Sequence, residues 1–170
     1  YHDSLTGLAN RKAFMSTMDK ALARCAQTGM NYGLLYLDLD NFKTVNDTMG
    51  HLAGDDYLVR VAGVLNNNTR DVDVAARLGG DEFVVLLENL DCREALKVAK
   101  SIRDDIRALG FDDCESNCIT SSSIGLAMIT EPELSRDEHL SRADRSVYQS
   151  KKLGGNSVSV WQSNQHQQWW

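Results

Sequence analysis

Two strand-like segments joined by a pair of glycines constrain the fold of this chain more than any other feature. The three pieces are "VDVAARL" (72–78), Gly79-Gly80 and "EFVVLL" (82–87). Apolar, β-branched runs on either side of a short glycine turn predict an antiparallel β-hairpin. The turn also carries two acids, Asp81 and Glu82, which a hairpin does not need. The segment is therefore a candidate site as well as a turn.

Helical patterns flank the hairpin on both sides. Asn10 can cap a helix over about 12–28, because its side chain can accept from the free N–H groups of the first turn, and Gly29 ends it. Apolar residues at three- and four-residue spacing predict further helices at about 54–66, 92–109 and 136–152. Apolar runs predict three more strands, at 32–37, 119–129 and 157–161.

The order of these elements predicts the fold class. After a leading helix the chain reads βαββαβ, with an additional αβ pair at the C-terminus. Together with the right-handed crossover rule, this order indicates an α+β fold with a ferredoxin-like βαββαβ core and a central antiparallel sheet. The length of 170 residues fits one domain, which we expect over 1–162, and the aperiodic residues 163–170 indicate a tail or linker.

Composition limits the partners. The formal net charge of −6 argues against a general nucleic-acid or anionic-membrane surface, so bound phosphate would need a metal ion or a local basic group. No stretch approaches the roughly 20 apolar residues that cross a bilayer. The cysteines at 25, 92, 114 and 118 have unrelated spacings, which favours reduced thiols and a cytoplasmic setting. Because the chain starts at Tyr1, we expect a fragment, and a membrane anchor outside it stays open.

Two acids end the first predicted strand. Asp38 and Asp40 are two residues apart, so both side chains leave the same face of the strand. Charged residues are common at strand ends, and a D-x-D pair alone is weak evidence for a site. However, the βαββ order can place the first strand beside the third, which would set Asp38 within about 5 Å of Asp81 and Glu82. Three or four carboxylates would then converge at one end of the sheet.

Converging carboxylates repel one another and need a compensating cation. Oxygen ligands suit the hard ions Mg²⁺ and Mn²⁺, which use one or two carboxylates together with water and substrate phosphates. The acids therefore predict a metal-dependent nucleotide site. Gly79 and Gly80 fit this interpretation, since a backbone without side chains lets a phosphate approach closely.

Between the two acid clusters lies "NFKTVNDTMGHLAGDD" (41–56). Lys43 follows the strand closely enough to reach phosphate. His51 and Asp55 are one helical turn apart, and with Asn46 they are candidates for binding guanine, whose N1–H and N2–H₂ groups can both donate to a carboxylate. Adenine has an acceptor at N1 and would leave the acid unpaired. Each residue also has a structural explanation, as a turn, loop or helix-dipole residue.

Five segments of the chain form an ordered set of motifs. They are "DSLTGLANR" (3–11), "LDLDNFKTVNDTMGHLAGD" (37–55), "GGDEF" (79–83), "SIG" (123–125) and "ADRSVYQSKKLGGN" (143–156). This set resembles the GGDEF domain of bacterial diguanylate cyclases. The resemblance implies a nucleotidyl cyclase or palm-like fold, and condensation of two GTP molecules into cyclic di-GMP with release of two pyrophosphates. It also implies Mg²⁺ or Mn²⁺ as cofactor and a symmetric homodimer, because one domain holds one GTP.

The resemblance also assigns roles to individual residues. Asp38, the backbone carbonyl of Leu39 and Asp81 would bind the metal, with Glu82 in support. Asp81 would accept the proton of the attacking 3′-hydroxyl, and Glu82 and Lys43 would complete the catalytic set. The residues implied to contact the nucleotide are Lys43, Asn46, His51, Asp55, Gly79, Gly80 and Lys151.

The segment "RDVD" (70–73) lies five residues before the GGDEF glycines, where the family's product-binding inhibitory site lies. Arg70 can fork onto a guanine edge or a phosphate, and Asp73 can accept from guanine. We therefore expect feedback inhibition by cyclic di-GMP, although an exposed ion pair would leave the same R-x-x-D pattern. The sequence departs from the family at Gly155, where arginine is frequent, so one phosphate contact is missing.

Two other functions stay open. The domain could be a catalytically weak module that binds GTP or cyclic di-GMP and regulates an attached domain, or a cyclase or polymerase palm that acts on one nucleotide. Intact Asp38, Asp81 and Glu82 favour catalysis over the first, and the GGDEF loop disfavours the second. The resemblance further implies an N-terminal sensor domain and leaves open a C-terminal phosphodiesterase domain outside this chain, whereas no nucleic-acid partner is expected.

Overall fold

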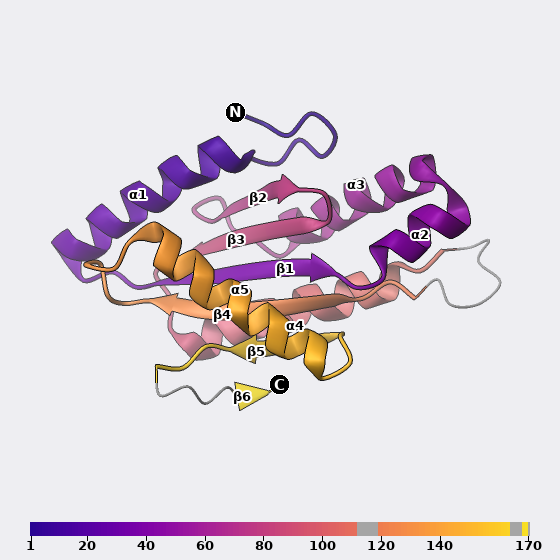
Figure 1. The fold of residues 1–170 in the computed structure, drawn as a ribbon. Coiled ribbons are helices and arrows are strands. Elements are labelled where there is room, and N and C mark those ends of the chain that lie inside the picture. The colour runs from indigo at the N-terminus through magenta and orange to yellow at the C-terminus, as the bar shows by residue number, and fades with distance from the viewer. Residues whose placement is uncertain (112–118, 164–167, 170) are drawn as a thin grey trace.

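The computed structural model describes residues 1–111, 119–163 and 168–169. Its helices are α1 (Arg11–Thr28), α2 (Phe42–Met49), α3 (His51–Asn67), α4 (Cys92–Leu109) and α5 (Arg136–Lys152). Its strands are β1 (Tyr32–Leu39), β2 (Val74–Gly79), β3 (Glu82–Glu88), β4 (Ser122–Ile129), β5 (Ser157–Val160) and β6 (Gln168–Trp169). They form one open sheet in the order β2-β3-β1-β4-β5-β6 (Figure 1).

The central strand β1 determines where the ends of its neighbours lie. It pairs antiparallel with β3 on one side and with β4 on the other, and β4 pairs parallel with β5. The register places Asp38 opposite Glu82 and Tyr32 opposite Glu88. The first and third strands are therefore neighbours, and the predicted α+β fold with a central, mainly antiparallel sheet is confirmed.

Helices cover both faces of the sheet, α1 and α5 on one face and α3 and α4 on the other (Figure 1). Side chains of β1 alternate between the two cores, because successive residues of a strand point to opposite faces. Leu35 and Leu37 join the core beneath α3 and α4, whereas Leu34 packs with Phe14 and Met18 of α1. Burial on both faces explains why the first predicted strand is a continuous apolar run.

Local signals set the helix ends. The Asn10 side chain accepts a hydrogen bond from the Ala13 N–H, and Gly29 ends α1 in the left-handed conformation at φ +75°. Asp91 and Glu94 form a capping box at the start of α4. The helices predicted at 12–28, 92–109 and 136–152 are confirmed to within one residue.

The segment after β1 differs from the prediction. The structure contains an additional helix there, α2, and α3 begins at His51 rather than near 54. Asn41 precedes α2 in the left-handed conformation at φ +58°, and Gly50 separates the two helices at φ +90°. Because α2 is short and fully buries one residue, Val45, its apolar pattern is too brief to indicate a helix.

Some expectations concern the edges of the described chain. The strand β6 belongs to the predicted tail and pairs antiparallel with β5. Cys25 and Cys92 are free thiols, while Cys114 and Cys118 lie outside the described residues. None of the helices in the described part of the chain is long and apolar enough to cross a membrane.

Candidate functional site

Acidic side chains meet where β1 ends and the turn between β2 and β3 begins. Asp38 lies opposite Glu82, and the Leu39 N–H donates to the Asp81 carbonyl over 3.3 Å. The Asp38 and Asp81 carboxyl groups lie within hydrogen-bonding reach of each other. Burial, followed by the charge of Asp81, raises the pKa of Asp38 to about 7, against the opposing effect of Lys151. The structure thus brings Asp38 and Asp81, two of the predicted metal-binding residues, close together at the end of β1.

The Glu82 side chain accepts a hydrogen bond from Tyr36, a residue that the sequence analysis did not identify. Its Oε2 accepts a hydrogen bond of 2.8 Å from the hydroxyl of Tyr36, on the same face of β1 as Asp38. Burial, and then the charge of Glu82, raises the pKa of Asp144 on α5. Within the described ranges, no group of three or more His, Cys, Asp or Glu side chains is close enough together to hold a metal ion. The predicted convergence is therefore a pair of carboxylates with a third nearby.

Asp40, the other acid of the D-x-D pair, has a structural role. Its buried side chain accepts hydrogen bonds of 2.7 Å from both Ser121 and Ser123 and of 2.9 Å from the Asn156 N–H. It thereby ties the end of β1 to β4 and to the turn before β5. Gly155 lies against it, because a Cβ at this position would come within 2.7 Å of the Asp40 carboxylate.

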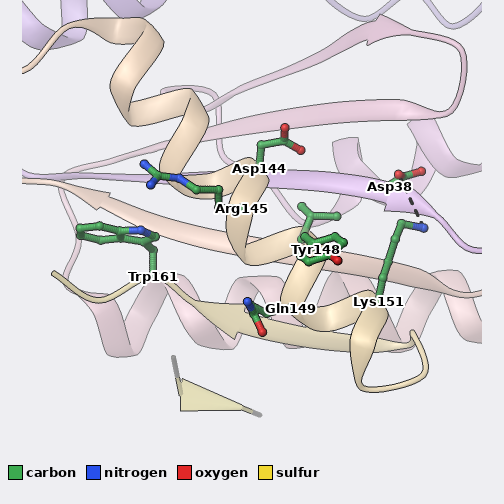
Figure 2. A pocket seen from close by; sticks show the side chains of 8 residues that line it. Asp38, Asp144, Arg145, Tyr148, Gln149, Lys151 and Trp161 are labelled. Carbon is green, nitrogen blue, oxygen red and sulfur yellow. Dashed lines mark ion pairs between the residues drawn. The ribbon is translucent and has the colours of Figure 1, made fainter. Parts of the chain in front are cut away.

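Lys151 is the cation beside these acids. Its Nζ lies 3.6 Å from an oxygen of Asp38 and 3.6 Å from an oxygen of Asp40, and it projects from the last turn of α5 (Figure 2). Asp38 and Lys151 open into a cavity of about 520 Å³ along α5, which Asp144 and Tyr148 also line. A bound polyphosphate would meet one cation and two carboxylates here, a charge pattern that suits phosphate bound together with a metal ion.

The glycine turn is open. Gly79 and Gly80 both have positive φ, +149° and +51°, and no atom lies within 4 Å of the Cβ that either could carry. Arg77 fixes the turn from the other side, because its guanidinium donates to the Gly80 carbonyl at 3.0 Å and pairs with Asp3 at 3.3 Å. The sequence contains no signal for the contact between Asp3 and Arg77, whose positions are 74 apart.

The three residues predicted to contact guanine lie on α2 and α3, on either side of Gly50. Asn46 belongs to α2, and His51 and Asp55 lie exposed in the first two turns of α3. Gly54 makes room for Asn46, whose Oδ1 occupies the position that a Cβ at residue 54 would take. Lys43 lies exposed in the first turn of α2, shortly after the acid pair. The chain thus places a candidate base site and a candidate phosphate site on consecutive elements.

Arg70 and Asp73 lie at the opposite end of β3. The Asp73 side chain, only 1% exposed, accepts from the Arg70 N–H and guanidinium and from the Glu88 N–H, at 2.8–3.1 Å. Arg70 also donates to the Glu88 carbonyl at 2.6 Å. Burial alone would raise the pKa of Asp73, but these hydrogen bonds outweigh burial and lower it. The pair therefore anchors the start of β2 to the end of β3.

Comparison with known proteins identifies the family. The family model described as "Diguanylate cyclase, GGDEF domain" matches residues 1–157. The chain is 37% identical over 158 residues to diguanylate cyclase TpbB of Pseudomonas aeruginosa, a match that covers 92% of this chain and 36% of that protein. It is 34% identical over 163 residues to the bifunctional diguanylate cyclase/cyclic di-GMP phosphodiesterase MucR of the same species, covering 96% of this chain and 24% of that protein.

A solved structure has the same fold. The coiled coil and GGDEF domain of DgcB from Caulobacter crescentus, in complex with c-di-GMP, matches with a TM-score of 0.87 at 33% identity, covering 94% of this chain and 84% of that one. The chain spans about a quarter to a third of the length of the two curated relatives above. From its motifs, its fold and these matches, the chain belongs to the GGDEF domain family of diguanylate cyclases.

Proposed function

We propose that this domain condenses two GTP molecules into cyclic di-GMP and releases two pyrophosphates. The observation that carries the proposal is the carboxylate pair of Asp38 and Asp81 beside Lys151, next to an open glycine turn. The names of the relatives, which are diguanylate cyclases, and the cyclic di-GMP bound to DgcB support the same substrate and product.

We place the guanine at the corner between α2 and α3. The Asp55 carboxylate can accept from both N1–H and N2–H₂ of guanine, whereas adenine offers an acceptor at N1. An acid that faces adenine would stay unpaired, so the site favours GTP over ATP. Asn46, held against Gly54, and His51 supply further polar contacts to the nucleotide.

The triphosphate extends from this corner to the acid pair. The start of α2 has free N–H groups, which favour an anion, and Lys43 and Lys151 add positive charge. Asp38, the Leu39 carbonyl and Asp81 offer hard oxygen ligands, which fit Mg²⁺ or Mn²⁺, ions that bind through one or two carboxylates together with substrate phosphates. When bound, such an ion offsets the negative charge that develops on the phosphates during transfer.

Asp81 is the proposed proton acceptor. The 3′-oxygen of one GTP attacks the α-phosphorus of the other, the bond from this phosphorus to the bridging oxygen breaks, and pyrophosphate leaves with the electron pair. The proton of the 3′-hydroxyl passes to Asp81. Because this step occurs twice with the roles of the nucleotides exchanged, two copies of the domain must face each other about a two-fold axis.

The test uses the purified domain, dimerised artificially, with GTP and Mg²⁺, followed by nucleotide chromatography. We expect one cyclic di-GMP for every two pyrophosphates from GTP, and no cyclic product from ATP. GTP binding without product under these conditions would contradict the cyclase and favour a binding module that regulates an attached domain.

We further propose that cyclic di-GMP inhibits the enzyme through Arg70. The Arg70 side chain is 55% exposed, and because its Nε and Nη2 already donate to Asp73 and Glu88, the Nη1 group can donate to a guanine edge or a phosphate. Asp73 already accepts from Arg70 and Glu88, so we assign it the role of holding Arg70 rather than of binding guanine. Arg70→Ala should relieve inhibition in assays with added product, and equal inhibition in the variant would place the regulatory site elsewhere.

A further inference from the structure

We propose that Tyr36 is a positioning residue that holds Glu82 as an outer carboxylate of the metal site formed by Asp38 and Asp81. The inference rests on the proposed function, because it concerns the same metal site. An outer carboxylate does not bind the ion itself; it accepts hydrogen bonds from groups around the ion and so fixes their orientation.

The strand pairing makes the contact between Tyr36 and Glu82 possible. Tyr36 and Asp38 are two residues apart on β1, so their side chains leave the same face of the sheet. Glu82 lies opposite Asp38, and Tyr36 is its diagonal neighbour, within reach of a long side chain. The Tyr36 hydroxyl donates to Glu82 Oε2 over 2.8 Å. A hydrogen-bond donor therefore lies beside the acid pair on the same face of β1.

This hydrogen bond decides where the Glu82 carboxylate lies. Among the described residues, Tyr36 is the one hydrogen-bond donor to the Glu82 side chain. Asp38 lies directly opposite Glu82 on the neighbouring strand, and like charges in such a cross-strand pair repel each other. Without the hydroxyl, repulsion would drive the carboxylate toward solvent. With the hydroxyl in place, one oxygen is occupied and the other can accept a hydrogen bond at the metal site.

The other end of β1 offers a matched control. Tyr32 lies on the same face as Tyr36, and its hydroxyl approaches Glu88 at 3.5 Å. Glu88 also pairs with Arg24 at 2.9 Å, so its carboxylate keeps a partner when the Tyr32 hydroxyl is removed. A change from tyrosine to phenylalanine removes the same atom at both positions and keeps the ring. The two variants therefore differ in whether the acid at the metal site loses its partner.

The experiment measures Mn²⁺ binding by electron paramagnetic resonance of the free ion, with a non-hydrolysable GTP analogue and without it. We expect Tyr36→Phe to weaken Mn²⁺ binding by about 10-fold or more, which is typical for the loss of an outer contact, and Tyr32→Phe to leave it unchanged. Thermal unfolding should be similar for both variants, which separates positioning from loss of the fold. Equal Mn²⁺ affinity in Tyr36→Phe and the unaltered domain would overturn the inference.

A double-mutant cycle tests whether Tyr36 acts through Glu82. Glu82→Ala should weaken Mn²⁺ binding, and adding Tyr36→Phe to it should weaken binding no further. If Tyr36→Phe weakened Mn²⁺ binding by the same factor in the Glu82→Ala background as in the unaltered domain, the positioning role would be refuted. Failure of the cyclase proposal looks different: the unaltered domain would bind Mn²⁺ with the GTP analogue and form no cyclic di-GMP, while the difference between Tyr36→Phe and Tyr32→Phe would remain.

Discussion

The two ends of strand β3 both have acidic side chains with basic residues nearby, but they differ in how far the charges are balanced. At the Glu88 end, two arginines face two acids. Arg24 pairs with Glu88 at 2.9 Å, and Arg70 pairs with Asp73 at 2.8 Å. Hydrogen bonds there overcome the effect of burial and lower the pKa of Asp73, so its ionised form is favoured. The charges at this end are balanced without any ligand.

The Glu82 end has more acid than base. Lys151 lies 3.6 Å from Asp38, yet burial and the charge of Asp81 still raise the pKa of Asp38 to about 7. Since β3 has seven residues, the two ends are about 20 Å apart and respond independently. One end of the strand therefore stabilises the fold, whereas the other keeps like charges together and needs an added cation. Such an arrangement is typical of functional sites.

The largest effect should follow from removing an acid at the Glu82 end of β3. Asp81→Ala is expected to lower cyclic di-GMP formation by about 100-fold or more, because a proton acceptor and a metal ligand are lost together. The melting temperature should stay equal or rise, because the repulsion with Asp38 is relieved. Nucleotide chromatography and thermal unfolding measure both quantities, and unchanged turnover would refute the assignment of Asp81.

At the Glu88 end of β3, removing an acid should lower the free energy of unfolding. Asp73→Ala removes the buried carboxylate that accepts from Arg70 and from the Glu88 N–H, at a cost of about 1–3 kcal/mol in the free energy of unfolding. Urea denaturation measures this loss. A stability equal to that of the unaltered domain would mean that the two ends do not differ as described.

The two ends should also respond to pH with opposite sign. The pKa of Asp38 is raised above the unfolded value of about 4, so its contribution stabilises the fold below about pH 4 and is lost as the pH rises through 7. The pKa of Asp73 is lowered, so its contribution is present above about pH 4 and is lost as the pH falls.

Thermal unfolding in EDTA between about pH 3 and pH 8 tests this contrast. Asp38→Asn should remove part of the decline in melting temperature between pH 5 and pH 8, and Asp73→Asn should remove part of the decline below pH 4. If both substitutions changed the same limb of the profile, the assignment of opposite signs would be wrong.

The smallest effect on stability is expected from changing Arg24, an exposed arginine at the Glu88 end of β3. Arg24 is 55% exposed, and its ion pair with Glu88 is open to solvent. Arg24→Ala should therefore cost less than about 1 kcal/mol in urea denaturation and less still at high salt. A loss as large as that of Asp73→Ala would show that the balance at this end depends on Arg24 as well as on Asp73.

Much of the fold could be predicted because its signals are local. Asn10 and Gly29 mark the ends of α1 by their own backbone preferences, and the glycine pair marks the hairpin. The helix α2 could not be predicted, since it buries Val45 alone and relies on tertiary packing against α3. Local chemistry is visible in a sequence, whereas packing supplied by a distant element is not.

The candidate site, like the fold, has some features that the sequence predicts and others that depend on distant contacts. The order of the elements placed Asp38 near Asp81 and Glu82, because in a βαββ unit the first strand can pair with the third. The partners of Asp40 and of Glu82 could not be foreseen, because they depend on which donors the register and the loops bring within about 3 Å. Ser121, for instance, reaches Asp40 from a position 81 residues away.

The contact between Gly155 and Asp40 limits how this sequence can change. Gly155 has φ +80°, and a Cβ there would come within 2.7 Å of the Asp40 carboxylate. An arginine at this position, which the resemblance to the family would imply, would need both a backbone conformation that L-residues rarely adopt and space that the carboxylate fills. A side chain at position 155 would therefore strain this turn, and relieving the strain would shift the carboxylate that ties the end of β1 to β4 and to the turn before β5.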